Sequence, residues 1–378
     1  MTTRRQFNKQ MGFAMLGSVL TSNNLSAAPK LGTAKAVSAS KGIGKEGWTI
    51  AVIPDSQNYA KFKKNQQHFD LMTEWIAKHM KAWNIQLVLH EGDFVEQNDI
   101  AQGGGPGFGD QNAEEQWRSA QRSMSTLYGK VPTILATGNH DYGFRNAENR
   151  QTRFNNYFGL TDNPLTCDGL GGGIWREGFT NSFGATTLEN AIYTLNAPDG
   201  RDILVASLEW GPRNEVVEWA KDSLGQLKYR NHFGILLTHS YLHDDNQRDG
   251  VKNRPGNPHR YPTGKGGNTN DGADLWEKLV KDSPNINLVL NGHVEGKHVG
   301  YRMDVKSNRD TVHQMLFNSQ GLGGGMRENG NGGDGWIRLL TFEPDRRTLS
   351  VRTFSPFMEK LGKTAWNTGP GHNFTVEI

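Results

Sequence analysis

The segment Ile286-Asn287-Leu288-Val289-Leu290-Asn291-Gly292-His293-Val294-Glu295-Gly296 joins an apolar run to a polar turn. The run from Ile286 to Leu290 predicts a buried strand, and Gly292 predicts that the chain turns directly after it. Because side chains of an extended chain alternate sides, His293 and Glu295 are expected to point the same way. Such pairs are common on protein surfaces, so the chemistry of this one depends on what the fold brings beside it.

Four other predicted strands end in polar residues of the same kind. Each is a short apolar run followed by carboxylate, amide or imidazole side chains. These strands and their polar groups are Trp48–Ile53 with Asp55 and Gln57, Ile85–Leu89 with Asp93, Pro132–Ala136 with Asn139, His140 and Asp141, and Phe233–Leu237 with His239.

Apolar residues at helical spacing separate these strands. The helical groups are Phe69, Met72, Ile76 and Met80; Trp117, Ala120, Met124 and Leu127; Val216, Ala220, Leu224 and Leu227; and Leu275, Trp276 and Leu279. This alternation predicts an α/β fold with a parallel sheet, in which ligands bind at the carboxyl ends of the strands. Antiparallel hairpins are expected for Ile192–Leu195 with Ile203–Leu208 and for Trp336–Phe342 with Leu349–Phe354, and loop for 161–182.

Composition excludes several classes of protein. The chain has 378 residues, and its 10% aromatic content with recurring apolar runs excludes a disordered chain. A net charge of only +3 gives no strongly basic surface, so no nucleic-acid partner is expected. The single cysteine, Cys167, excludes an internal disulfide framework.

The N-terminus is typical of a bacterial export signal. Arg4-Arg5 with Phe7 and Lys9 precedes a mildly apolar run, which predicts a twin-arginine-type signal over residues 1–40 and a single domain over 47–378. The alternative is an ordinary basic leader. Cleavage is expected after Ser26-Ala27-Ala28 or after Ala34-Lys35-Ala36. The predicted location is periplasmic or secreted, the predicted partner is the twin-arginine export machinery, and no membrane anchor is expected.

The polar strand ends together predict a metal centre. Their ligand set is Asp55, Gln57, Asp93, Asn139, His239, His293 and Glu295. Seven ligands exceed the need of one ion, so we expect two divalent ions with Asp93 as the bridge. Such a pair, about 3.5–4 Å apart, activates a bridging hydroxide and neutralises phosphoryl oxygens. His140 is expected to protonate the leaving oxygen, with Asp141 holding its imidazole tautomer.

With these motifs in order, the sequence resembles the calcineurin-like metallophosphoesterase family. That family's pattern is D-x-H, GD-x-x-D/N, GNH-D/E, a lone His after an apolar strand, and GH-x-H. The matches are Asp55, Gly92-Asp93 with Glu96, Gly138-Asn139-His140-Asp141, His239 and Gly292-His293. The resemblance implies two sheets flanked by helices, with the strands after Val299 completing the second sheet. The Asp-Ser-Gln start also resembles a bacterial exported branch of the family.

Two positions depart from the family pattern. Gln57 and Glu295 replace the two histidines that, in the family, bind one and the same ion. One site is therefore all oxygen, for which Mn²⁺ is the first expectation, whereas the site with His239 and His293 suits Fe, Zn or Mn.

The predicted function is an exported phosphoric ester hydrolase that acts on phosphate mono- or diesters of a small molecule or polymer. The alternatives are a non-catalytic metal- or phosphate-binding protein of the same fold, and a nuclease. Substrate contacts are expected from the loops 97–112, 161–182 and 241–270.

Overall fold

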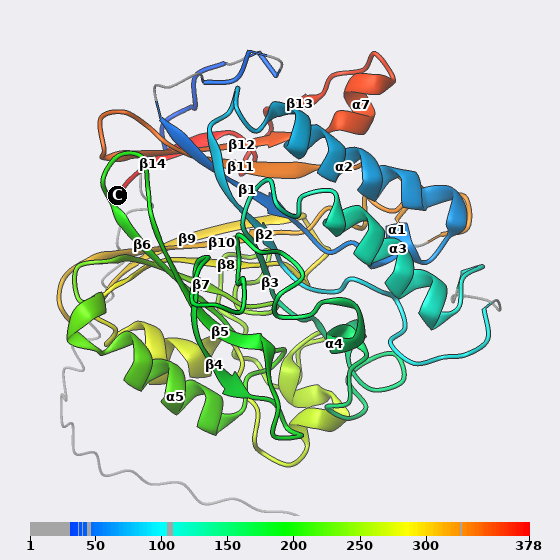
Figure 1. The fold of residues 1–378 in the computed structure, drawn as a ribbon, viewed down its shortest axis with the longest axis horizontal. Coiled ribbons are helices and arrows are strands. Elements are labelled where there is room, and N and C mark those ends of the chain that lie inside the picture. The colour runs from blue at the N-terminus through cyan, green and yellow to red at the C-terminus, as the bar shows by residue number, and fades with distance from the viewer. Residues whose placement is uncertain (1–30, 37, 40, 44–46, 104–108, 326) are drawn as a thin grey trace, which may run out of the picture. The chain divides into compact units, whose positions relative to one another are not determined.

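Two sheets of seven strands each stack face to face in the computed structural model, which describes residues 31–36, 38–39, 41–43, 47–103, 109–325 and 327–378 (Figure 1). The first sheet has the order β13 (Trp366–Asn367), β12 (Thr348–Phe354), β11 (Ile337–Phe342), β1 (Trp48–Ile53), β2 (Ile85–His90) and β3 (Thr133–Leu135), with β14 (Phe374–Glu377) also paired to β12. The second has the order β4 (Trp175–Thr180), β5 (Thr186–Asn196), β6 (Asp202–Ser207), β7 (Phe233–Leu237), β8 (Ile286–Asn291), β10 (Thr311–Phe317) and β9 (Val299–Val305).

Helices cover the outer faces of both sheets. Figure 1 shows α2 and α3 on the first sheet and α5 on the second. The α-helices are α1 (Gln57–Ala60), α2 (Gln66–His79), α3 (Ala113–Ser125), α4 (Phe154–Tyr157), α5 (Asn214–Leu224), α6 (Gly272–Leu275) and α7 (Pro356–Lys360). Shorter turns are η1 (Lys63–Asn65), η2 (Asn139–Asp141), η3 (Leu227–Tyr229), η4 (Pro258–Arg260), η5 (Pro262–Gly264) and the π-helical η6 (Trp276–Val280). The predicted α/β sandwich of two sheets flanked by helices is confirmed.

Parallel strands form the centre of each sheet. β1, β2 and β3 are parallel in the first sheet, and β6, β7, β8 and β10 are parallel in the second. Most residues of these strands are buried, which explains the apolar runs of β1, β2, β6, β7 and β8. In β1, for example, Ile50 and Val52 pack between the sheets whereas Ala51 and Ile53 face the helices.

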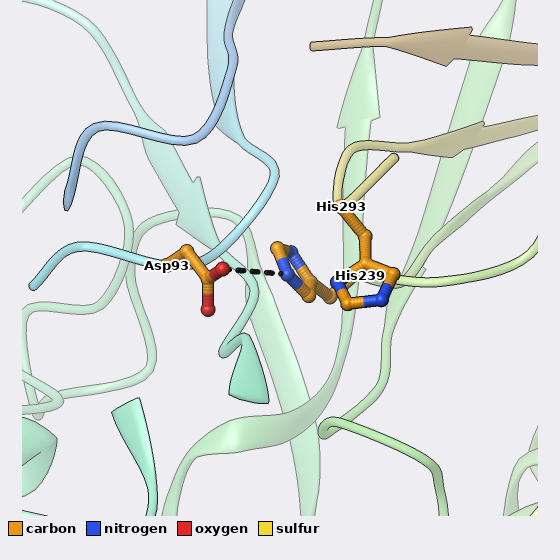
Figure 2. Close-up of side chains that lie close together, drawn as sticks. All are labelled: Asp93, His239 and His293. Atoms are coloured by element: carbon orange, nitrogen blue, oxygen red, sulfur yellow. Dashed lines mark ion pairs between the residues drawn. The ribbon is translucent and has the colours of Figure 1, made fainter. Parts of the chain in front are cut away.

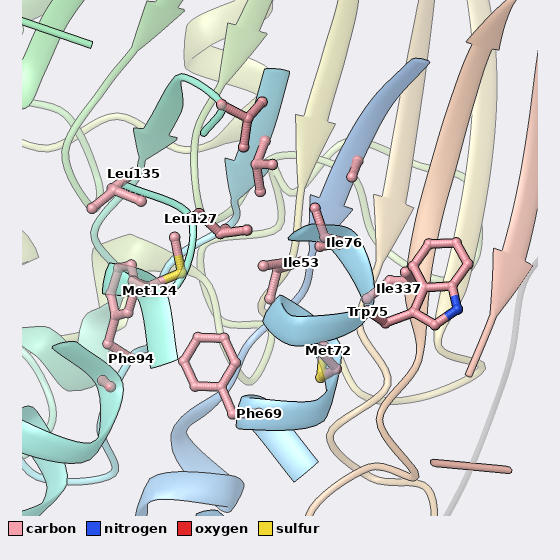
Figure 3. Close-up of a cluster of buried hydrophobic side chains, with 14 of the residues drawn as sticks. Ile53, Phe69, Met72, Trp75, Ile76, Phe94, Met124, Leu127, Leu135 and Ile337 are labelled. Carbon is pink, nitrogen blue, oxygen red and sulfur yellow. The ribbon is translucent and has the colours of Figure 1, made fainter. Parts of the chain in front are cut away.

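The core between the first sheet and its helices shows why the helical spacing was informative. Phe69, Met72 and Ile76 of α2 pack with Met124 of α3 against Ile53 of the sheet (Figure 3). The start of α3 is fixed by a capping box, in which the Asn112 side chain accepts from the Glu115 N–H and the Glu115 carboxylate accepts from the Asn112 N–H. A cap of this kind stabilises a helix by about 1 kcal/mol.

The prediction for the strands after Val299 is wrong in part. β9 and β10 join the second sheet, but β11 to β14 extend the first sheet instead. β11 pairs antiparallel with β1, and the rings of Trp48 and Phe342 stack 4.0 Å apart across that pair. Strand periodicity gives the buried faces of a strand but not its hydrogen-bonding neighbour, so this assignment needed the tertiary structure.

Two local predictions also need correction. Part of the predicted loop 161–182 is β4, an edge strand whose polar and glycine-containing sequence is only partly buried and so lacks an apolar run. The helix expected around Leu275 is one α-helical turn followed by the π-helical η6.

The predicted targeting segment, 1–40, lies mostly outside the described residues, and Leu31–Ile378 form one compact unit. The described end of the segment belongs to that unit and contacts the rest of it through Gly32 with Thr375, Lys35 with Arg352, and Ala39 with Trp83. Cleavage after Ala28 would leave these contacts intact, whereas cleavage after Ala36 would remove the first two. Among the described residues, no helix has both the length and the apolar character needed to cross a membrane.

Candidate metal centre

The carboxyl ends of β1, β2, β3, β7 and β8 bring the predicted ligands to one place. A cleft of about 340 Å³ opens there. Of the predicted site residues, those that line it are Gln57, Asp93, Asn139, His140, His293 and Glu295. Asp55 and His239 are fully buried and are not among the lining residues.

Asp93 is the hub of the centre. Its Oδ2 lies 3.1 Å from His239 Nε2 and accepts a hydrogen bond from Gln57 Nε2 at 3.1 Å. Its Oδ1 accepts from the His140 backbone N–H at 2.8 Å. Ligand atoms of Asp93, His239 and His293 all lie within 4.8 Å of one another, and this group is a candidate metal site (Figure 2).

Two glycines make this convergence possible. Gly92 has φ +99°, and a Cβ there would lie 2.8 Å from His239 Nδ1. A Cβ on Gly292 would lie 2.0 Å from Asp55 Oδ1. Any side chain at either position would therefore displace a predicted ligand, which is the physical reason for glycine before Asp93 and before His293.

Asp55 is held from several directions. Both of its oxygens accept from the His293 backbone N–H, at 3.2 and 3.1 Å. Its Oδ2 also accepts from Asn318 Nδ2 at 2.8 Å and Gln320 Nε2 at 3.3 Å, and lies 4.0 Å from His239 Nε2. This carboxylate links the ends of the two sheets.

Backbone carbonyl groups orient both histidines. His239 Nδ1 donates to the Glu91 carbonyl at 2.7 Å, so its Nε2 faces Asp93. His293 Nε2 donates to the Gly256 carbonyl at 2.8 Å, which leaves its Nδ1 as the available nitrogen. A backbone carbonyl that receives the second ring N–H is the usual support of a metal-binding histidine.

Two buried amide oxygens test whether the residues fit a metal ion. Gln57 Oε1 and Asn139 Oδ1 have no hydrogen-bond partner among the described residues. The amide nitrogens do have partners: Gln57 Nε2 donates a hydrogen bond to Asp93 at 3.1 Å, and Asn139 Nδ2 donates one to Asn146 at 2.7 Å. An unsatisfied buried acceptor costs about 1–3 kcal/mol, and a divalent cation beside these oxygens would remove that cost. The donor set therefore fits metal ions.

The pKa values reflect a dense cluster of buried charge. Burial raises the pKa of Asp55 to about 8. Burial opposes the charged form of His239, but the carboxylates of Asp93 and Asp55 outweigh it and raise the pKa to about 10. Burial likewise opposes ionisation of Asp93, yet the His239 cation keeps its pKa below the ordinary value. Burial and the His239 charge lower the pKa of His293 to about 3.

These values predict that metal binding depends on pH. At pH 7 the metal-free centre holds protons on Asp55 and His239, and an ion must displace them. Acidification therefore favours the metal-free form, and the Kd for Mn²⁺ should rise by about tenfold or more per pH unit between pH 8 and pH 6. Calorimetric titration at several pH values, in buffers of different ionisation enthalpy, measures both the Kd and the protons released. A Kd that does not change over this range would contradict the prediction.

The environment of His140 corrects one expectation. Its Nδ1 donates to the Glu96 carbonyl at 2.8 Å, so that carbonyl, not Asp141, fixes the tautomer and leaves Nε2 for the cleft. Asp141 instead accepts from the backbone N–H groups of Phe94 and Gly138, both at 2.8 Å. The Asp141 carboxylate thus connects the loop after β2, which contains Phe94, to the loop after β3, which contains Gly138.

Glu295 lies in the cleft for a different reason than expected. β8 ends at Asn291, and His293 has φ +70°, so strand alternation does not apply to these residues. Glu295 faces the same cleft as Glu96, and burial together with the Glu96 charge raises its pKa. The Nζ of the fully buried Lys61 lies 3.3 Å from Glu96 Oε1 and partly offsets the negative charge of Glu96 and Glu295.

Sequence reasoning missed the role of Asn318 and Gln320. Both hydrogen bond to Asp55, and Gln320 lines the cleft. They follow β10, which is parallel to β8, so the rule that located the other strand ends also applies to them. Of the three loops expected to contact substrate, 241–270 supplies cleft residues, whereas the described parts of 97–112 and 161–182 supply none.

The chain is similar to one protein family, to one bacterial protein and to one solved structure. The profile of the calcineurin-like phosphoesterase family matches residues 49–295. The protein "Uncharacterized protein YvnB" of Bacillus subtilis (strain 168) is 28% identical over 329 residues, which cover 83% of this chain and 20% of that protein. The chain thus spans about a fifth of that relative's length. The solved structure "GAP50 the anchor in the inner membrane complex of Plasmodium" has 11% identity and a TM-score of 0.42, with 88% of each chain covered.

Proposed function

The chain belongs to the calcineurin-like phosphoesterase family, and from this premise we propose that it is an exported, metal-dependent hydrolase of phosphate mono- or diesters. The observation that carries the proposal is the pair of unsatisfied amide oxygens, Gln57 Oε1 and Asn139 Oδ1, around the Asp93–His239–His293 group. Buried acceptors without donors are suited to cations, and the cleft gives a substrate access to them.

Asp93 would be shared between two ions in this proposal. Asp55, Gln57 and Glu295 would complete an oxygen-rich site, and Asn139, His239 and His293 would complete the other. Bound divalent ions supply positive charge against phosphoryl oxygens and a water molecule of lowered pKa. The buried carboxylates and the carbonyl-anchored histidines hold the ligand atoms in fixed positions, so little reorganisation accompanies the reaction.

His140 would supply the proton for the leaving oxygen. Burial lowers the pKa of this imidazole, but the charges of Asp93 and Glu96 raise it by more, and the net shift is upward. The upward shift increases the share of protonated imidazole, which is the form that a general acid requires. Because Nδ1 is committed to the Glu96 carbonyl, the transferable proton is the one on Nε2.

A hydrolysis assay after metal removal tests the proposal. Chelator-treated protein should be inactive toward 4-nitrophenyl phosphate and bis(4-nitrophenyl) phosphate, and divalent metals should restore hydrolysis of at least one. No hydrolysis with Mn²⁺, Zn²⁺ or Fe²⁺, alone or in pairs, while metal still binds would favour a non-catalytic binding protein instead.

The same assay addresses the two unusual ligands. Because carboxylate and amide oxygens suit harder ions, we expect one ion to be retained through purification and added Mn²⁺ to complete the activity. The double variant Gln57→His with Glu295→His should shift the preference toward Zn²⁺ or Fe²⁺. Two tightly retained ions of one kind in the unmodified protein, with no change of preference in the variant, would refute this assignment.

Export is supported by Arg4-Arg5 ahead of the mildly apolar run. Replacing both arginines by lysine should leave the protein in the cytoplasm, as cell fractionation would report. Unchanged accumulation outside the cytoplasm would exclude the twin-arginine route.

A further inference from the structure

One imidazole of the metal cleft, that of His243, has no part in the proposed ligand set and is not the proposed acid. It lines the cleft from the loop after β7 of the second sheet, whereas His140 lines the cleft from η2, which follows β3 of the first sheet. The His243 side chain is 20% exposed. It is therefore held by its surroundings and is still accessible to a molecule that enters the cleft.

The backbone of His243 has a fixed position relative to the candidate metal centre. Asn291, at the end of β8, holds the preceding residue, because its Oδ1 accepts from the Leu242 N–H at 3.0 Å and its Nδ2 donates to the Leu242 carbonyl at 3.1 Å. The His243 N–H then donates to the Gln247 carbonyl at 2.8 Å. Since Asn291 lies two residues before His293, these bonds join the loop of His243 to the turn that carries a candidate metal ligand.

A carboxylate orients the His243 ring. The ring contacts Asp244 through Nδ1, in an ion pair with Oδ1 of that carboxylate. Asp244 Oδ2 accepts from the Lys297 backbone N–H at 3.0 Å, and a Cβ on Gly296 would lie 2.0 Å from the same oxygen. Asp244 is thus fixed between two loops, and its contact with Nδ1 leaves Nε2 as the His243 nitrogen that can bind a ligand.

His243 is separate from the close group of candidate metal ligands. Among the described residues, that group consists of Asp93, His239 and His293, whose ligand atoms lie within 4.8 Å of one another. His243 is not a member of it, although metal ligation by histidine is common. We therefore consider His243 as a contact for the substrate.

The side chains of the cleft offer little positive charge to an anion. The described residues that line it include no lysine and no arginine, and three of them are histidines. His293 donates through Nε2 to the Gly256 carbonyl, which leaves Nδ1 for a metal ion, and His140 is the proposed acid. His243 therefore remains as the lining side chain that can present a positive charge to a bound phosphate group.

Phosphate monoesters and diesters differ in what they offer to this side chain. A monoester presents three non-bridging oxygens, and a diester presents two. Two divalent ions can each neutralise one of these oxygens, so a monoester leaves one more for a protein group. Because that oxygen only accepts hydrogen bonds, the His243 imidazole would bind it in its doubly protonated form, with Nδ1–H toward Asp244 and Nε2–H toward the oxygen.

We propose that His243, oriented by Asp244, binds this remaining phosphoryl oxygen and makes the protein selective for phosphate monoesters. The inference rests on the proposed function, because it assumes that a phosphoryl group occupies the metal centre. In a diester a neutral ester oxygen and its substituent replace the charged oxygen, so the diester forms no charge-assisted hydrogen bond with His243.

Binding of two small anions tests this role without requiring turnover. The probes are methylphosphonate, with three free oxygens, and dimethyl phosphate, with two, titrated calorimetrically into Mn²⁺-loaded protein. His243→Ala should weaken methylphosphonate binding by about tenfold or more, as expected for loss of a charge-assisted contact, and should change the Kd of dimethyl phosphate by less than about twofold. His243→Gln should keep part of the methylphosphonate affinity, because its amide nitrogen can still donate.

The matched control is His232→Ala, a histidine just before β7 that does not line the cleft, and it should change neither Kd. An equal change for both probes in His243→Ala, or no change for either, would overturn the assignment. Loss of bound Mn²⁺ in that variant would also overturn it, since His243 would then be a metal ligand. If neither probe binds to the unmodified protein and no phosphoester is hydrolysed, the proposed function itself is rejected.

Discussion

Asp93→Asn is expected to lower kcat/KM by a factor on the order of 10⁴ and to abolish tight binding of both ions. The substitution preserves shape but removes the charge that lies 3.1 Å from His239 Nε2. It also removes the main attraction that raises the pKa of His239, so the His239 imidazole loses its proton more easily as well as losing the carboxylate beside it. Among the described carboxylates, Asp93 is the one that forms with His239 and His293 a group whose ligand atoms all lie within 4.8 Å of one another, so its loss removes the shared ligand.

Metal content by mass spectrometry and steady-state kinetics on the same preparation measure the effect. The control is Asp70→Asn, since Asp70 pairs with Arg122 on the helix layer and does not line the cleft. We expect that variant to keep its metals and its kcat. A variant Asp93→Asn that retains two ions and near-normal kcat/KM would show that the hub of the centre has been misassigned.

His140→Ala is expected to lower kcat by about 10²–10⁴ while the metal content stays near that of the unmodified protein. The His140 side chain bonds to the Glu96 carbonyl and is outside the close Asp93–His239–His293 group, so its loss removes a proton donor and no ligand. The loss should be smaller for phosphate esters with good leaving groups, because these need less protonation.

The pH profile gives a second measurement of the same role. His140 must be protonated to act as an acid, so the rate should fall as pH rises through the pKa of its imidazole. In His140→Ala this alkaline decline should disappear. His232→Ala, at the opposite end of β7 from the centre, is the control and should keep the profile. A loss in His140→Ala that is equal for leaving groups of very different pKa would assign His140 a structural role instead.

Local features of the sequence determined the strands and the polar turns at their carboxyl ends. Runs such as Ile85–Leu89 are largely buried on both faces, and that burial requires an apolar residue at nearly every position. Parallel strands place their carboxyl ends at one edge, so knowing the strands was sufficient to expect Asp55 and Asp93 near one another, whereas His239 follows β7 of the other sheet and reaches them because the two sheets stack. The sequence also predicted a turn at Gly292, and the structure adds the reason for glycine at 92 and 292, where a Cβ would collide with the centre.

The tertiary structure alone decided the partners of these elements. The pairing of β11 with β1, the bond from His140 to the Glu96 carbonyl, and the contact of Gly256 with His293 join segments far apart in the chain. Backbone carbonyl and N–H groups carry no sequence signature, since every residue except proline offers the same donor and acceptor. For that reason the sequence predicted which side chains gather at the candidate metal centre, whereas the folded chain decided how each is held and which loops line the cleft.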